Sequence, residues 1–382
     1  MFHGSRIEID KTAYHHNIKF LTRHLGKNVV FSSVVKGNAY GHGIERFVPM
    51  AKAEGVRHFS VFNANEALRV RQSVQDVGVM IMGMIDDAEV EWAINNEVSF
   101  YIFDLPRLEA ALKFAQKSQK PAMVHFEVET GMYRTGMEEK ELEKAIEIFL
   151  KNRELLKLEG FCTHFSGAES DDNRERIAQQ IAKFKYFKEK IAAQNVRPRL
   201  FHTACSAASL RYPETNMDMV RIGIAQYGFW PNEETKDFFH KANPGISNPL
   251  KRLLCWKSKV MSFKTVPKGA YVGYGLSYKS EQDLSLAAVP LGYANGFSRV
   301  LSNKGAVLIN GQKAPVVGMV NMNMVLVKIE HIPNVKRGQE VTLIGQEGEE
   351  EISVASFGDS SNSLNYELLT RIPLDIPREV VG

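Results

Sequence analysis

The chain has 382 residues, of which 44% are hydrophobic, so it can bury a large core and is long enough for two domains. Its net charge of +4 is small for this length, and basic residues are interleaved with acidic ones, which argues against nucleic acid or a membrane surface as a partner. A small-molecule partner fits this composition better.

The cysteines and the N-terminus bear on the compartment. Cys162, Cys205 and Cys255 are widely spaced and form no CxxC pair, which argues against a disulfide framework and against a zinc site. We therefore expect no metal and a reducing compartment. The N-terminal segment has no apolar signal core, and the chain has no apolar run long enough for a membrane span. These features predict a cytoplasmic protein.

Short apolar, β-branched segments recur through the first part of the chain. Between most of them lie charged segments with helical spacing, such as RLEAALKFAQKSQK from Arg107 and ERIAQQIAKFKYFKEKIAAQ from Glu175. Eight such units in roughly 230 residues predict an α/β fold, a (β/α)8 TIM barrel, with an open doubly wound sheet as the alternative. The eight strand segments begin at Val29, His58, Gly78, Val98, Ala122, Leu158, Arg199 and Met219.

After about Asn232 the pattern changes to closely spaced strands with few helical stretches between them. Strand segments begin at Gly269, Ala287 and Val307, and Asn310-Gly311 is typical of a type I′ hairpin turn. The sequence therefore predicts a β-rich C-terminal domain after the barrel.

The segment FFHKANPGISNPLKR from Phe238 concentrates Pro, Asn and Gly, so it is interpreted as the linker. We expect a barrel domain over residues 1–239 and a β-rich domain over residues 240–382.

In a barrel of this kind the active site forms at the C-terminal ends of the strands, and here those ends carry polar residues. Randomly placed polar residues would be scattered along the strands. The residues at or near the strand ends are Lys36, Glu127, Glu129, Arg134, His164, His202, Ser206 and Arg221.

Lys36 at the end of the first strand has two interpretations. It is either a lysine whose stem lies along the strand while its amine reaches water, or an amine in a dry pocket whose pKa falls so that it can act as a nucleophile. Position alone favours the first interpretation.

The surrounding sequence VVKGNAYGHG favours the second, because it resembles the attachment motif for pyridoxal 5'-phosphate (PLP) of the alanine racemase family. Further matches follow in the family's order over both domains, and the chain is similar to this fold-type III family over its whole length. They are ETGMYRTG from Glu129, THFSGAES from Thr163, CSAAS from Cys205, MVRIGIAQYG from Met219, VGYGLSY from Val272, LGYANGF from Leu291 and VNMNM from Val320.

The resemblance implies a PLP-dependent racemase of L- and D-alanine with two proton-transfer groups, which would supply D-alanine for the cell wall in a bacterium. Lys36 would hold PLP covalently and serve as one base. Tyr274 would be the second base, contributed by the other subunit, so a homodimer with two shared active sites is expected. A free tyrosine ionises near pH ~10, so Tyr274 would need help from neighbouring groups.

The resemblance also assigns the cofactor contacts. Arg221 would face the pyridine nitrogen, which a guanidinium cannot protonate. His164 would hydrogen-bond Tyr274 and contact Arg221. The phosphate would be held by Tyr40, Ser206, the backbone amides of Gly223 and Ile224, and Tyr366. Free backbone amides beside the last two barrel strands also suit an anion on general grounds.

The substrate carboxylate would be received by Arg134 and by the backbone at Met322. The sequence departs from the family near this site. Glu127 stands where the family has a lysine that is often carbamylated, and GMVNMN with Met319 and Asn323 stands where GRxxMD is common. These departures leave serine, lysine or ornithine open as the preferred substrate.

Asn295 in GYANGF replaces another usual aspartate. Glu127 either presents a built-in anion to Arg134 or merely ends a strand and faces solvent.

Two other functions are weighed against the racemase. A PLP-dependent decarboxylase shares the two-domain plan but places a carboxylate at the pyridine nitrogen, so Arg221 argues against it. A non-catalytic PLP carrier of the same barrel type would lack the β-rich domain and Tyr274.

Overall fold

The structure is a computed structural model that describes residues 3–354 and 365–382. For residues 365 and 366 it describes the backbone but not the side chains. Its internal contacts divide the chain into two units. The barrel unit comprises residues 13–36 and 48–252, and the strand-rich unit comprises residues 1–12, 37–47 and 253–382. The predicted division into residues 1–239 and 240–382 remains a proposal for where two domains separate along the chain.

The barrel unit contains eight parallel strands in the order β8-β7-β6-β5-β4-β3-β2-β9. An isolated parallel bridge between Cys205 and Arg221 links the two ends of this order, so the barrel is nearly closed. The prediction of a (β/α)8 barrel is confirmed. The strands are β2 (Val30–Val34), β3 (His58–Val61), β4 (Gly78–Ile81), β5 (Ser99–Ile102), β6 (Ala122–Glu127), β7 (Leu156–Cys162), β8 (Leu200–His202) and β9 (Met219–Ile222).

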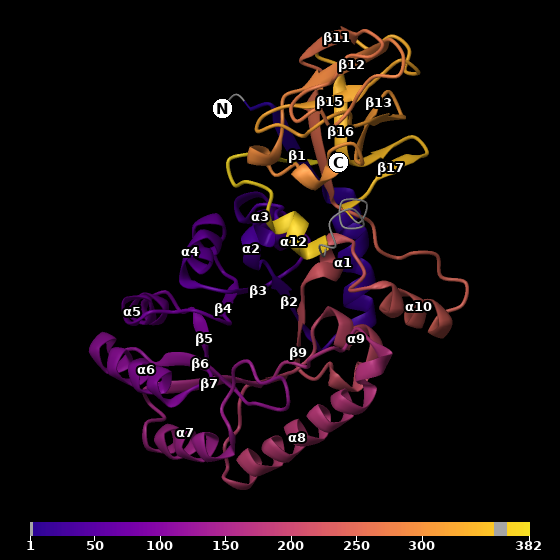
Figure 1. Ribbon diagram of the computed structural model, residues 1–382. Helices are drawn as coiled ribbons and strands as arrows, with labels where there is room; N and C mark the ends of the chain where they lie inside the picture. Colours follow the sequence, from indigo (N-terminus) through magenta and orange to yellow (C-terminus); the bar gives the residue numbers. More distant parts are fainter. Residues whose placement is uncertain (1–2, 355–364) are drawn as a thin grey trace. The chain divides into compact units, whose positions relative to one another are not determined.

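Helices follow the strands, and Figure 1 shows α4 to α8 arranged around the outside of the barrel strands. Their ends have local causes: the Asp104 side chain accepts a hydrogen bond of 2.9 Å from the Arg107 amide and so caps α6. Both quoted helical segments are confirmed. The helices are α1 (Lys11–Leu25), α3 (Ile44–Ala53), α4 (Ala64–Ser73), α5 (Asp87–Asn95), α6 (Leu105–Ser118), α7 (Glu139–Lys151), α8 (Arg174–Ala193), α9 (Ser206–Arg211) and α10 (Glu233–Ala242).

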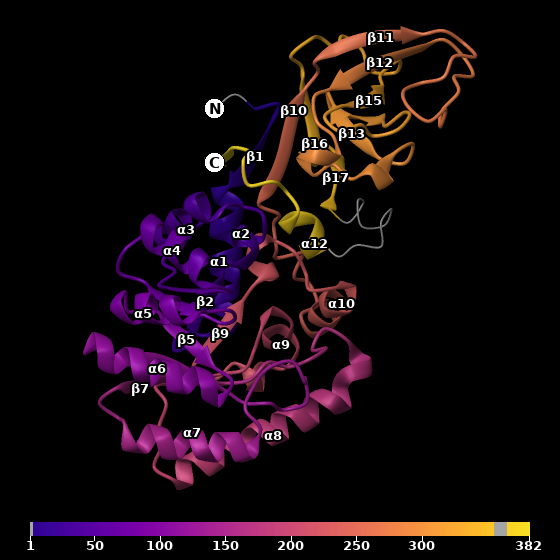
Figure 2. The same cartoon turned by 60° about the vertical axis from the view of Figure 1, so that its left-hand side comes forward.

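The strand-rich unit is built from two sheets, and Figure 2 labels their strands other than β14 and β18. The larger has the order β14-β13-β16-β10-β1-β18 with β17 paired to β16, and the smaller has the order β11-β12-β15. The elements are β1 (Ser5–Asp10), β10 (Leu254–Lys259), β11 (Ser262–Val266), β12 (Leu284–Val289), β13 (Ala306–Ile309), β14 (Gln312–Pro315), β15 (Val325–Lys328), β16 (Glu340–Glu347), β17 (Glu350–Ile352), β18 (Arg378–Val381) and α12 (Asn365–Thr370).

The first strand of the chain belongs to this second unit, although its residues lie in the range predicted for the barrel. β1 pairs antiparallel with β10 and parallel with β18. Its buried residues alternate with half-buried ones, which is the pattern of a strand with one face in a core.

One predicted hairpin is confirmed and one predicted strand is wrong. β13 and β14 are joined by Asn310 and Gly311 with φ of 52° and 72°, as a type I′ turn requires. The segment from Gly269 instead forms a loop closed by a single bridge between Tyr271 and Lys279. Gly273 and Gly275 adopt φ of 70° and 75°, so the chain reverses where a strand would continue.

A left-handed turn follows the first barrel strand. In the segment labelled α2 (Lys36–Tyr40), Asn38, Ala39 and Tyr40 have φ of 56°, 54° and 50°. Each such residue costs roughly 1–2 kcal/mol. The Gly41 and Gly43 amides donate hydrogen bonds of 3.0 and 2.9 Å back to Gly37 and Asn38, which helps to hold this conformation.

None of the helices within residues 3–354 and 365–382 combines the length and the apolar character that crossing a membrane requires.

Candidate active site

The barrel strands direct alternate side chains inward and outward. The rings of Phe126 and Phe161 point outward, because they contact Phe149 on α7 and Phe184 on α8. Their neighbours therefore point into the barrel. The interior is unusually polar for a barrel of this class, in which bulky aliphatic residues generally dominate. The buried inward polar residues are Ser32, His58, Ser60, Ser99, His125, Glu127, His202 and Arg221.

Lys36 lies two residues beyond the last residue of β2, at the C-terminal mouth of the barrel. Its side chain reaches solvent, but surrounding protein removes much of its hydration, and this desolvation lowers its pKa. The nearby cations Arg134 and Arg221 lower the pKa further. A lysine in this setting yields the neutral amine that nucleophilic and base chemistry need.

Arg221 on β9 is 4% exposed, and its guanidinium is held on several sides. One terminal nitrogen lies 2.5 Å from His202 Nδ1 and donates to the His202 carbonyl at 3.1 Å. The other donates to the carbonyls of Thr163 and Thr203 at 2.9 Å each, and lies 3.4 Å from His164 Nδ1. This clamp fixes the plane of the guanidinium.

His164, just beyond the end of β7, thus lies near Arg221, as the resemblance implies. Burial lowers its pKa well below the usual value, and Arg221, Arg134 and Lys36 lower it further. His164 is therefore neutral at pH 7. Because arginine can only donate, His164 Nδ1 accepts from it, and the proton of the neutral ring is on Nε2.

The residues expected to hold the phosphate lie where two short helices begin. Ser206 starts α9, and Ile224 starts η3 (Ile224–Tyr227) directly after β9. The Gly223 amide donates a 2.9 Å hydrogen bond to Ser206 Oγ, so these two residues are brought together. Tyr40 is half-buried on the left-handed turn, and the side chain of Tyr366 lies outside the described residues.

Glu127 ends β6 and is only 4% exposed, so the expectation that it merely faces solvent is wrong. Burial raises the pKa of its carboxyl, against the lowering effects of a hydrogen bond with Thr135 and of Arg221 and Arg134. One carboxyl oxygen, Oε2, is buried and has no hydrogen-bond partner among the described residues. Arg134 is exposed and donates no hydrogen bond to this oxygen.

Tyr274 and Met322 lie on neighbouring loops of the strand-rich unit and are exposed, at 74% and 56%. The Met322 loop is held through its backbone, since the Ala294 amide donates to the Met322 carbonyl at 3.0 Å. Leu276 on the Tyr274 loop and Tyr293 in the short helical turn Tyr293–Asn295 are also large exposed side chains. The strand-rich unit thus exposes a tyrosine together with other large hydrophobic side chains.

His125 and Ser99 form part of a buried network that the sequence did not identify. His125 Nδ1 lies 2.9 Å from His202 Nε2, and His125 Nε2 lies 3.1 Å from Ser99 Oγ. The sequence signal for this network is a histidine inside the apolar strand segment AMVHFEVE. Its partners, however, belong to other strands.

The buried histidines should make the protein acid-labile. Burial lowers the pKa of His58 from 6.5 to about 4 and that of His125 and His202 well below 6.5. Between pH 6.5 and the folded-state pKa, the unfolded chain binds a proton at each histidine and the folded chain does not. The free energy of unfolding should therefore fall as pH falls below 6.5, by up to about 1.4 kcal/mol per pH unit for each histidine.

Urea unfolding followed from pH 7.5 to 5 measures this slope, and His58→Gln should make it shallower by one proton. A stability that stays constant across this range would contradict the neutral, buried state of these rings.

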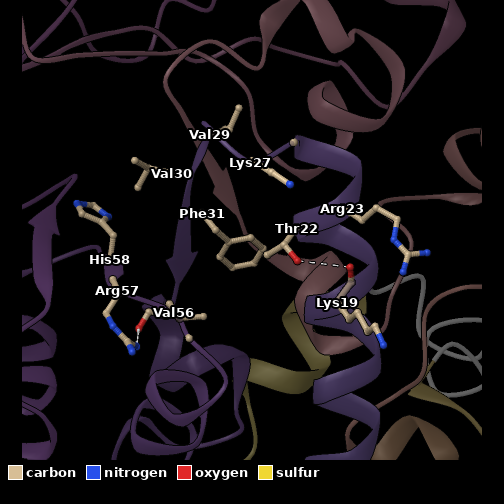
Figure 3. Close-up of a pocket in the computed structure, with 12 residues that line it drawn as sticks. Lys19, Thr22, Arg23, Lys27, Val29, Val30, Phe31, Val56, Arg57 and His58 are labelled. Carbon is tan, nitrogen blue, oxygen red and sulfur yellow. Dashed lines mark hydrogen bonds between the residues drawn. The ribbon is translucent and has the colours of Figure 1, made fainter.

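A separate cavity of about 670 Å³ opens at the other end of the barrel, where β2 and β3 begin (Figure 3). The side chains of Lys19 and Arg23 point away from Phe31 in this view. The cations around the cavity do not converge on one point, and it contains none of the residues expected to be catalytic.

Comparison with known proteins shows that two family models match this chain. "Alanine racemase, N-terminal domain" matches residues 9–231 and "Alanine racemase, C-terminal domain" matches residues 253–380.

Curated relatives and solved structures agree with these matches. The alanine racemase of Leptospira interrogans is 34% identical over 99% of this chain and 96% of its own length, and that of Methanococcus maripaludis is 32% identical over 97% of each. The Bacillus anthracis alanine racemase with bound L-Ala-P superposes with a TM-score of 0.90 and 30% identity, covering 100% of this chain and 96% of that one. The Bartonella henselae alanine racemase with covalently bound pyridoxal phosphate has a TM-score of 0.83 and 26% identity, with complete coverage of both chains.

Proposed function

The chain belongs to the alanine racemase family, and from this premise we propose that it interconverts L- and D-alanine with PLP, using Lys36 and Tyr274 as its two proton-transfer groups. One observation carries the proposal: the barrel mouth holds a lysine with a lowered pKa together with an arginine clamped beside a neutral histidine.

The residues at the barrel mouth fit PLP. Lys36 offers an amine of lowered pKa for covalent attachment. Ser206, Gly223 and Ile224 lie at the starts of two short helices, where backbone amides suit a phosphate. Arg221 offers a fixed guanidinium for the pyridine nitrogen. When bound, PLP supplies an electron sink that makes the substrate α-proton acidic.

Racemisation needs one group on each face of the substrate α-carbon, because the proton leaves one face and another returns to the opposite face. The Lys36 amine takes or returns the proton on one face, and the Tyr274 hydroxyl of the partner subunit serves the other. His164 assists Tyr274 with its Nε2–H, which its neutral tautomer leaves available as a donor. A hydrogen bond to the phenolate form would favour that form.

Arg221 determines which reaction follows proton removal. Burial alone would lower the pKa of its guanidinium, but Tyr101, Cys162 and neighbouring groups raise it, so the charge is retained. A guanidinium that keeps its protons would not protonate the pyridine nitrogen of bound PLP, and it would thereby leave PLP a weaker electron sink than a protonated ring. Rapid return of the proton to the α-carbon is then favoured over transamination, and a decarboxylase arrangement with a carboxylate there is disfavoured.

The active protein is proposed to be a homodimer with two shared sites. The exposure of Tyr274, Leu276 and Met322 in the same unit supports this, because exposed hydrophobic side chains suit a protein interface. A cytoplasmic location is proposed on the basis of the free cysteines Cys162, Cys205 and Cys255.

Arg134 and the backbone at Met322 are proposed to receive the substrate carboxylate. The unpartnered oxygen of Glu127 supports a role for this buried carboxyl beside that site, and a water molecule can bridge it to Arg134.

Glu127→Gln should lower kcat/KM about 10- to 100-fold, since a charge-assisted hydrogen bond contributes about 1.5–3 kcal/mol. Activity of the native protein should not respond to bicarbonate, because no carbamate forms at this position. Glu154→Gln, at an exposed carboxylate, is the matched control. Native-like activity of Glu127→Gln, or activation by bicarbonate, would remove this role.

A single assay tests the proposed function. The purified protein is incubated with PLP and individual L-amino acids in deuterated buffer, and exchange at Cα, release of CO2 and formation of the D-isomer are measured. We expect D-alanine with deuterium at Cα and no CO2. Preferred turnover of serine, lysine or ornithine would reassign the substrate, CO2 release would indicate a decarboxylase, and binding without exchange would indicate a carrier.

A further inference from the structure

The guanidinium of Arg221 is the outer end of a line of hydrogen bonds through the barrel interior. The contacts run from Arg221 to His202 Nδ1 at 2.5 Å, from His202 Nε2 to His125 Nδ1 at 2.9 Å, and from His125 Nε2 to Ser99 Oγ at 3.1 Å. Ser99 Oγ donates to the backbone carbonyl of Val79 at 3.2 Å. The line therefore joins β9, β8, β6, β5 and β4.

The chemistry of the two ends fixes the direction of every bond. Arginine only donates, so His202 Nδ1 must accept, and a neutral His202 carries its proton on Nε2. That proton is donated to His125 Nδ1, which leaves the His125 proton on Nε2, facing Ser99. The Val79 carbonyl only accepts, so it takes the Ser99 hydroxyl proton. Each group donates once along the line, and reversing any one bond would place two donors or two acceptors face to face.

The surroundings of the line keep both rings neutral and in place. Ser99, His125, His202 and Arg221 are at most 6% exposed. Burial lowers the pKa of both histidines, and the charge of Arg221 lowers it further. Gly160 makes room for the pair, because a Cβ at this residue would lie 2.0 Å from His125 Nδ1 and 2.8 Å from His202 Nε2.

We propose that His125 and Ser99 are positioning residues for Arg221, which act through His202 to fix the rotation of the guanidinium. The inference rests on the proposed role of Arg221 beside PLP. Neither residue touches the cofactor; each acts by holding the next group in one orientation. A guanidinium that could rotate would no longer face the pyridine nitrogen with constant geometry.

A second buried polar group in the same barrel supplies the control. His58 Nδ1 lies 2.8 Å from Ser32 Oγ, which lies 2.5 Å from Ser60 Oγ. Ser60 is buried like Ser99, but its hydrogen bonding leads to Ser32 and His58 rather than to Arg221. Ser60→Ala and Ser99→Ala therefore remove the same atom from similar surroundings, and only the second interrupts the line.

The first test compares holoenzyme variants by kinetics and by the visible circular dichroism of bound PLP. Ser99→Ala should lower kcat about tenfold, which is about 1.4 kcal/mol in the barrier, with KM little changed and the dichroic band altered. Ser60→Ala should keep the native kcat and band. His125→Asn retains an acceptor for His202 and should keep at least about tenfold more of kcat than His125→Phe. Equal behaviour of Ser99→Ala and Ser60→Ala would overturn the proposal.

The second test reads the proton positions directly and does not depend on activity. In protein labelled with 15N at histidine, the ring nitrogens of His125 and His202 should report neutral Nε2–H tautomers at pH 7. A charged ring or an Nδ1–H tautomer at either residue would overturn the inference, even if His125→Phe fails to fold. If native protein neither binds PLP nor racemises alanine, the proposed function fails. The tautomer measurement still tests whether the hydrogen bonds from Arg221 to Ser99 run in the inferred direction.

Discussion

Replacing Lys36 with alanine is expected to abolish racemisation and covalent attachment of PLP. Lys36 is proposed both to hold the cofactor and to move one of the two protons. Its loss should therefore lower the racemisation rate at least ~10⁴-fold, which is the upper end of what one positioned base contributes. The lowered pKa of Lys36 depends on burial and on the nearby charges of Arg134 and Arg221, which an added amine in solution would not reproduce. Borohydride reduction followed by peptide mass spectrometry measures attachment, and D-alanine formation measures activity.

Lys19→Ala provides the control for Lys36→Ala, because Lys19 lies beside the cavity at the other end of the barrel and should leave both measurements unchanged. A reducible linkage to another lysine in Lys36→Ala would show that the attachment site is wrong.

Replacing Tyr274 with phenylalanine is expected to lower kcat about 10²- to 10⁴-fold while PLP remains attached. The substitution removes one hydroxyl from a side chain that is 74% exposed in the single chain, so it should not disturb packing. Lys36, Ser206 and Arg221 are unchanged in this variant, which is why the cofactor should stay bound. Cofactor content and the rates in both directions are the measurements.

Tyr271→Phe is the matched control, since Tyr271 is a second exposed tyrosine of the same loop. Mixing Lys36→Ala with Tyr274→Phe chains should restore part of the activity, because some mixed dimers contain one intact site. If subunit exchange is demonstrated and activity does not return, Tyr274 does not act across the dimer.

The barrel was predictable because each of its strands is a short apolar run whose partners are its neighbours along the chain. β3 and β4, for example, are successive strands that pair in parallel. A helix with its own cap, such as α6 after Asp104, also carries its signal locally.

β1 was not predicted, since the six residues SRIEID carry three charges and find their partners in β10 and β18. A strand whose pairing lies at the other end of the sequence has no local signal beyond alternation. The loop around Tyr274 was predicted as a strand for the opposite reason: its aromatic residues favour strands, but Gly273 and Gly275 adopt left-handed conformations.

The candidate site was predictable where a residue lies at a strand end and within a motif, as Lys36, His164 and Arg221 do. Their contacts follow from barrel geometry, which brings strand ends together. His125 lies within a strand rather than at its end. Its role depends on the ring of His202 from another strand, and on the missing side chain of Gly160.

The pairing of β1 with β10 and β18 also has a consequence during synthesis. About 240 residues separate the end of β1 from the start of β10. At typical rates of 5–20 residues per second, β1 leaves the ribosome roughly 10–50 s before its first partner strand. Throughout that interval the barrel can assemble, while Ile7 and Ile9 remain without the sheet that later buries them. The nascent chain should therefore expose hydrophobic residues of β1, a binding site for chaperones that closes only after β10 has been synthesised.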